Sequence, residues 1–87
     1  MTKTEMCRKV TGLNGGQRTL VYYLIDDGGD RARYGVSVLL EESGEKKEIR
    51  RLSNDRERIE KLVDLLATDF VTPGALDDVV YRFLSGL

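Results

Sequence analysis

The sequence contains no histidine, no tryptophan and a single cysteine, Cys7, among its 87 residues. Without histidine the chain cannot form a His-based metal site or a Ser-His or Cys-His catalytic pair. A single cysteine excludes a disulfide within the chain and is typical of a reducing compartment. The longest apolar run, residues 20–25, is far shorter than the roughly 20 residues of a membrane-spanning helix. These absences predict a non-enzymatic cytoplasmic protein with no membrane segment, no cofactor and no bound metal.

The composition that remains is typical of one small globular domain. The chain has 14 Lys and Arg against 15 Asp and Glu, which gives a net charge of −1, and 40% of its residues are hydrophobic. That apolar content is too high for a disordered chain. The length allows one hydrophobic core and not two. We therefore predict a single domain over residues 1–87.

The first half of the chain alternates strand-like segments with glycine turns. Segments rich in Val, Ile, Leu, Tyr and Thr cover residues 5–12, 18–26, 31–41 and 46–52. The turns between them are Asn14-Gly15-Gly16, Gly28-Gly29 and Ser43-Gly44. Connections this short leave no room for helices, so we predict a four-stranded antiparallel meander.

The turns also predict which residues share a face of the sheet. A two-residue turn at Gly28-Gly29 places Val21 opposite Val36, and a two-residue turn at Ser43-Gly44 places Val38 opposite Ile49. One face then collects valine, isoleucine and tyrosine side chains and becomes the core. The opposite face still carries four large apolar residues, which are Leu20, Tyr22, Leu24 and Leu39.

The second half of the chain changes from a period of two to a period of 3.6 residues. Ser53 or Asn54 is placed to cap a helix whose apolar stripe runs from Ile59 to Phe70. Thr72-Pro73 opens a second amphipathic helix, which Gly86 ends. Two helices packed on one face of a meander make a two-layer α+β domain.

The apolar residues on the predicted solvent face indicate an interface, because soluble monomers rarely expose such patches. We expect Leu20, Tyr22, Leu24 and Leu39 to contact another protein. The contact would be with a second copy in a homodimer or with a different partner, in a regulatory or adaptor role. A terminus or bent strand of the chain itself is the other candidate to cover this patch.

Single-stranded nucleic acid is an alternative ligand for the same face. Tyr22 would stack on a base, and Arg33 and Arg50 would contact phosphates. The net charge of −1 weakens phosphate attraction. Protein contact is therefore the favoured function.

Two groups of reactive residues have ordinary structural explanations. Asp26, Asp27 and Asp30 crowd a glycine turn, but tight turns favour Asp and Gly for backbone reasons, and the EF-hand spacing is absent. Cys7 has no histidine to lower its pKa, so a structural thiol is expected. We predict neither a metal site nor a catalytic residue.

The sequence resembles a family of small bacterial proteins of unknown function. The resemblance rests on Tyr34-Gly35-Val36 in a strand and on the pattern Val-Thr-Pro-x-x-Leu-x-Asp-Val over residues 71–79, and it spans about residues 20 to 85. It implies a stand-alone cytoplasmic domain. It assigns no activity, cofactor or catalytic residue.

Overall fold

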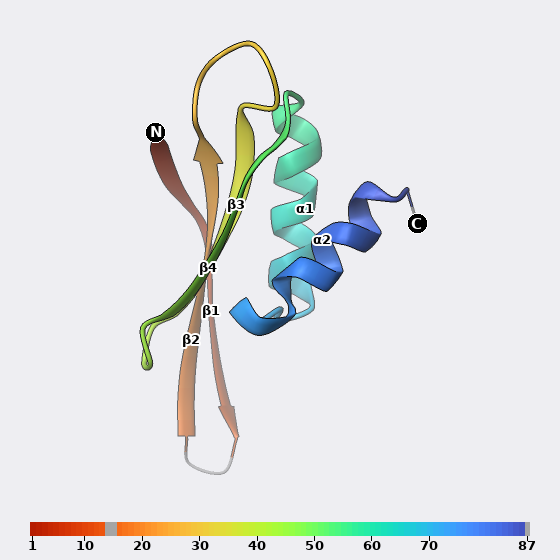
Figure 1. Ribbon diagram of the computed structural model, residues 1–87. Helices are drawn as coiled ribbons and strands as arrows, with labels where there is room; N and C mark the ends of the chain where they lie inside the picture. The colour runs from red at the N-terminus through yellow and green to blue at the C-terminus, as the bar shows by residue number, and fades with distance from the viewer. Residues whose placement is uncertain (14–15, 87) are drawn as a thin grey trace.

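A computed structural model of the chain describes residues 1–13 and 16–86. Its elements are, in order, β1 (Thr2–Leu13), β2 (Gly16–Asp26), β3 (Tyr34–Leu40), β4 (Glu45–Ser53), α1 (Arg56–Thr68), the 3-10 turn η1 (Pro73–Ala75) and α2 (Leu76–Leu84). The strands form one antiparallel sheet in the order β1-β2-β3-β4, and both helices lie on one face of it (Figure 1). The predicted α+β meander with two C-terminal helices is confirmed. Asn14 and Gly15 of the first predicted turn lie outside the described residues.

The hairpin of β1 and β2 extends beyond the other two strands. Pairing between β2 and β3 begins at Leu20 opposite Leu40, whereas β1 and β2 pair as far as Leu13 opposite Gly16. Residues 10–13 and 16–19 therefore form a two-stranded arm at one end of the sheet, as Figure 1 shows. We call these residues the hairpin arm.

The predicted register between β2 and β3 is wrong. The observed partners are Tyr22 with Val38 and Leu24 with Val36, a shift of three residues from the predicted pairing. An odd shift exchanges the two faces of a strand. The cause is the connection, which is a seven-residue loop over residues 27–33 instead of a two-residue turn. It is closed by a hydrogen bond of 2.7 Å from Asp27 N to Arg33 O.

The corrected register places the large side chains of β2 under the helices. Leu20, Tyr22 and Leu24 join Val36 and Val38 in the core of the domain. Their partners from the C-terminal half of the chain are Ile59, Leu62, Val63, Leu66, Ala67, Val71, Leu76 and Val80. Burying this set removes a large apolar surface from water, which stabilises the observed register.

The connection between β3 and β4 also differs from its prediction, but with a smaller consequence. Val36, and not Val38, lies opposite Ile49. The turn spans residues 41–44, so the pairing shifts by two residues. An even shift keeps the same side chains on each face, and the predicted facing of β3 relative to β4 is therefore correct.

The first helix is shorter than its pattern predicts. It starts slightly later and ends slightly earlier. Asp55 is the N-cap, and its carboxylate accepts a hydrogen bond from Arg58 N at 3.2 Å. The helix ends at Thr68, so Phe70 leaves the apolar stripe with a φ of 51° and is 45% exposed. Gly86 adopts a φ of 81° after α2, as expected for a C-terminal cap.

Candidate functional site

Three of the four predicted interface residues are inaccessible. Leu20, Tyr22 and Leu24 are 3%, 0% and 1% exposed. The Tyr22 hydroxyl donates a hydrogen bond of 3.0 Å to the carbonyl oxygen of Val71, in the connection between α1 and η1. These residues cannot contact a partner, and Tyr22 cannot stack on a base. These three residues, which were expected in an exposed patch, therefore belong to the core. The reason is that the β2–β3 loop is longer than a two-residue turn.

The face of the sheet turned away from the helices, which we call the outer face, carries Leu39 and the charged residues. Leu39 alone of the predicted set lies on this face, and it is half-buried. Val21, Ile25 and Ser37 are each fully buried there, although residues 1–13 and 16–86 form no second layer of secondary structure over this face. Other side chains on the same face must therefore shield them from water.

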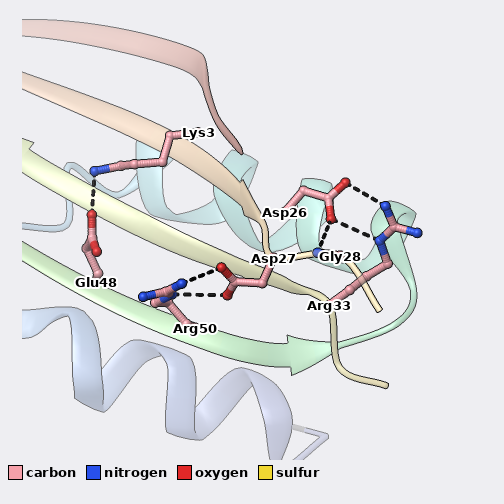
Figure 2. Close-up of polar contacts among 7 residues, drawn as sticks. All are labelled: Lys3, Asp26, Asp27, Gly28, Arg33, Glu48 and Arg50. Atoms are coloured by element: carbon pink, nitrogen blue, oxygen red, sulfur yellow. Dashed lines mark hydrogen bonds and ion pairs between the residues drawn. The ribbon is translucent and has the colours of Figure 1, made fainter. Parts of the chain in front are cut away.

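An ion pair that crosses the sheet provides part of this cover. Lys3 on β1 binds Glu48 on β4, so the pair extends over both central strands (Figure 2). Between the edges, Lys3 Nζ lies 5.2 Å from the centroid of the Tyr23 ring. Lysine stems of this kind cover apolar surface while the charge stays near water. The hydrogen bond from Lys3 lowers the pKa of Glu48.

Two more ion pairs occupy the end of the sheet at the β2–β3 loop. Arg50 binds both carboxylate oxygens of Asp27, at 3.0 and 2.5 Å, and Arg33 binds both oxygens of Asp26, at 2.9 Å each (Figure 2). Asp26 also accepts a hydrogen bond of 2.9 Å from Gly28 N. The guanidinium groups lower the pKa of both carboxyls.

These pairs determine what the loop and the outer face can do chemically. Arg33 and Arg50, the two predicted phosphate contacts, already bind carboxylates in the bidentate geometry that a phosphate would need. The Asp26 and Asp27 oxygens likewise face cations of the chain itself. Within residues 1–13 and 16–86, no group of three metal-ligating side chains is assembled. The cluster therefore links the loop to β4 through Arg50 and closes the loop on itself through Arg33.

The two edges of the sheet differ in how much of their backbone is free to pair. On β4, Arg51 has a φ of 58° and the register shifts beside it, between Tyr34 and Val36. Such an irregularity disrupts the regular row of donors and acceptors that another strand would need. Lys46 and Lys47 add charge along the same edge. The regular part of the β4 edge is therefore limited to residues 45–49, which is shorter than the regular part of the β1 edge.

The bulge of β4 also explains Gly35 of the Tyr34-Gly35-Val36 segment. A Cβ atom at this position would lie 2.7 Å from the Cα of Arg50 and still closer to the carbonyl oxygen of Ile49. Only glycine permits the two backbones to approach this closely.

The β1 edge is regular over residues 7–13, because its single bulge lies before them, between Glu5 and Cys7. At its centre, Val10 lies opposite Thr19. Thr19 N donates to Glu42 Oε1 at 2.7 Å, and Thr19 O accepts from Glu41 N at 2.9 Å, both on the β3 side. Opposite residues of antiparallel strands alternate between exchanging both hydrogen bonds and exchanging none. The N–H and C=O of Val10 therefore point away from β2.

The same alternation gives Arg8 and Gly12 outward-pointing backbone groups. We call residues 7–13 with these outward groups the open edge. The Val10 side chain, on the outer face, is 57% exposed. On the helix side, Lys9 Nζ lies 5.7 Å from the ring centroid of the exposed Phe70. Apolar groups thus border the open edge on both faces of the sheet.

The hairpin arm is hollowed next to Val10. Glycine at positions 12 and 16 leaves a surface hollow lined by Val10, Thr11, Gly12, Gly16 and Gln17. The hollow lies along the open edge and has no titratable group in its lining.

Sequence reasoning missed the open edge, although part of its signal was readable. The alternation of Val, Thr and Gly over residues 10–12 marks a strand. The sheet order determines which side of that strand lacks a partner. The sequence shows that this strand comes first in the chain, but not that it lies at an edge of the sheet. Cys7 lies on the helix face, half-buried against the core, as expected for a structural thiol.

No helix of the described chain is long and apolar enough to span a membrane. Among known proteins, the sequence model of a family of unknown function (DUF6514) matches residues 1–86. Neither the curated proteins nor the solved structures contain a match.

Proposed function

The chain belongs to this family of unknown function, and since membership specifies no activity, we propose from the surface geometry that it is a non-enzymatic protein-interaction domain. Its role would be regulatory or that of an adaptor. The interacting element is the open edge of β1. The half-buried, unpaired Cys7 fits a cytoplasmic location.

The observation that carries this proposal is the outward direction of the Val10 backbone. Val10 is at the middle of seven regularly paired residues, and its N–H and C=O face away from β2. An extended partner strand binds such an edge through main-chain hydrogen bonds, and alternate side chains provide specificity. The β4 edge is regular over a shorter stretch, residues 45–49, and a positive φ at Arg51 interrupts it beyond that point.

Protein contact at the open edge replaces the interface that the sequence predicted. The outer face carries ion pairs where an apolar patch was expected, and Leu39 is the only predicted interface residue on it. Nucleic-acid binding at the predicted residues is disfavoured, because the Tyr22 ring is buried in the core. Arg33 and Arg50 are already bound to Asp26 and Asp27. The edge is the surface that remains.

Capture from native cells with the tagged chain and Val10→Pro tests the proposal. Proline removes the outward N–H while leaving the β1–β2 hydrogen bonds intact, because Val10 donates none to β2. Val10→Thr is the matched control, since it keeps the N–H and the branched β-carbon. We expect the wild type and Val10→Thr to retain a protein partner, or an untagged copy, after nuclease treatment at moderate salt.

The same partners should be lost from Val10→Pro, whose circular dichroism should match that of the wild type. Retention of the same proteins by Val10→Pro would reject the open edge as the interacting element. Recovery that nuclease abolishes would indicate nucleic acid and overturn the proposal of protein contact.

A further inference from the structure

We infer that the strand that pairs with the open edge is β1 of a second copy, antiparallel, with Val10 opposite Val10. This inference rests on the proposed function and adds the identity of the partner. The resulting two-fold axis passes between the two Val10 residues. Both copies use the same surface, as closed dimers do.

Backbone direction limits the registers that two β1 strands can adopt. Hydrogen bonds can form only between residues whose N–H and C=O point outward, and these are Arg8, Val10 and Gly12. The two-fold axis must therefore lie at one of the positions from residue 8 to residue 12. Each choice gives a different set of opposed side chains.

Charge and length select one register among these. An axis at Arg8 or at Lys9 places that cation directly opposite its own copy, which is destabilising. An axis at Thr11 or Gly12 leaves fewer residues to pair before the strand ends at Leu13. With the axis at Val10, Lys9 lies opposite Thr11, and the whole segment 7–13 is paired.

The outer face of the open edge fits this register. Arg8 lies opposite Gly12 of the second copy, where the missing side chain leaves the hollow beside Val10. The Arg8 guanidinium is already compensated by Glu5 and Glu41, at 3.1 and 2.6 Å. The second copy can therefore approach without placing an unpaired cation in the interface. Two 57%-exposed Val10 side chains become neighbours on one face of a continuous sheet.

The helix side of the edge fits the same partner. A two-fold axis perpendicular to the sheet keeps both helix layers on the same side. The exposed Phe70 rings, each beside Lys9 of its own chain, then border the joined edge from that side. An acidic extended peptide is the competing occupant, because residues 7–19 contain Arg8, Lys9 and Arg18 and no acid. The mass of the purified chain in solution separates the two.

Light scattering on the purified chain gives the first test. We expect a dimer for the wild type and for Val10→Thr, and a folded monomer for Val10→Pro. A wild type that stays monomeric up to millimolar concentration would overturn the second copy as partner. If capture from cells still depends on the Val10 N–H in that case, the proposed function survives. If Val10→Pro also captures the same proteins as the wild type, both the proposed function and the second copy as partner are wrong.

Disulfide formation tests the register. Paired residues that exchange hydrogen bonds lie about 5.5 Å apart at Cα, within the range of about 4.4–6.8 Å that a disulfide spans. Val10→Cys in a Cys7→Ala background should therefore form a covalent dimer on oxidation. Gln17→Cys in the same background is the control, since residue 17 lies on the same face but on β2. Equal cross-linking of the two variants would overturn the register.

Discussion

Tyr22 shows how a single residue can have opposite roles in two registers. In the predicted register its ring faces solvent, and in the observed one it is fully buried with its hydroxyl bound to Val71 O at 3.0 Å. Burial raises the pKa of Tyr22 to about 12 from the ordinary 10.0, and Cys7 adds to the shift. The folded state therefore holds the phenol proton more tightly than the unfolded chain does.

The sign of this linkage gives a prediction for Tyr22→Phe. The stabilisation is complete below about pH 10 and is lost as the pH rises from about 10 to 12. Tyr22→Phe should lower the free energy of unfolding by about 1 kcal/mol at neutral pH, because one buried hydrogen bond is lost. It should then lose less stability than the wild type in alkali, as measured by urea titration at several pH values.

Tyr81→Phe is the control for that comparison, because Tyr81 is 75% exposed. It should change neither the neutral stability nor its alkaline loss. Identical alkaline losses in the wild type and Tyr22→Phe would contradict the buried position of the Tyr22 hydroxyl.

Gly35 gives a second prediction at the scale of one residue. Its added Cβ would lie 2.7 Å from the Arg50 Cα, so the backbone of β4 must shift to admit it. We expect Gly35→Ala to destabilise the fold by about 1–3 kcal/mol, the range of an overpacked core site. Gly74→Ala is the matched control, because its Cβ would have no neighbour within 4 Å. Equal thermal midpoints for the two variants would refute the close approach.

At the scale of elements, most boundaries follow from local patterns. Four strands, two helices and their order are predicted correctly, because period and turn residues act over a few positions. The β2–β3 register is predicted incorrectly, because Gly28-Gly29 between aspartates has the pattern of a two-residue hairpin turn. Asp27 of the seven-residue loop binds Arg50, which lies 23 positions further along the chain. No local pattern reports such a contact.

The loop gives a prediction for acid. Arg50 holds the pKa of Asp27 below the ordinary 3.8. The stabilisation is therefore present above about pH 4 and is lost as the pH falls further. We expect Asp27→Asn to lower the thermal midpoint at neutral pH, and its difference from the wild type to shrink below about pH 4.

Asp30→Asn removes an acid from the same loop and leaves both bidentate pairs intact. It should leave the midpoint close to that of the wild type. A difference between Asp27→Asn and the wild type that persists undiminished at low pH would show that the Asp27 charge does not stabilise the loop.

In the whole molecule, the two faces and the two edges of the sheet differ in what covers or interrupts them. Helices cover one face, ion pairs cover the other, and a bulge disrupts the β4 edge. The open edge of β1 keeps the longer regular row of outward backbone groups, over residues 7–13, whereas β4 pairs regularly over residues 45–49. Pairing of two copies at the open edge would give one eight-stranded sheet with both helix layers on the same side.

The sequence by itself determined the class of the fold, because hydrophobic period, glycine turns and helix caps act through neighbours along the chain. It also excluded histidine-based chemistry through composition alone. Only the tertiary structure decided which face of β2 is buried and which edge is open. Both involve contacts between residues distant in sequence: Asp27 of the seven-residue loop binds Arg50, and the Thr19 backbone points toward Glu41 and Glu42. Because strand side chains alternate, a shift of three residues was enough to move Tyr22 from the surface to the core.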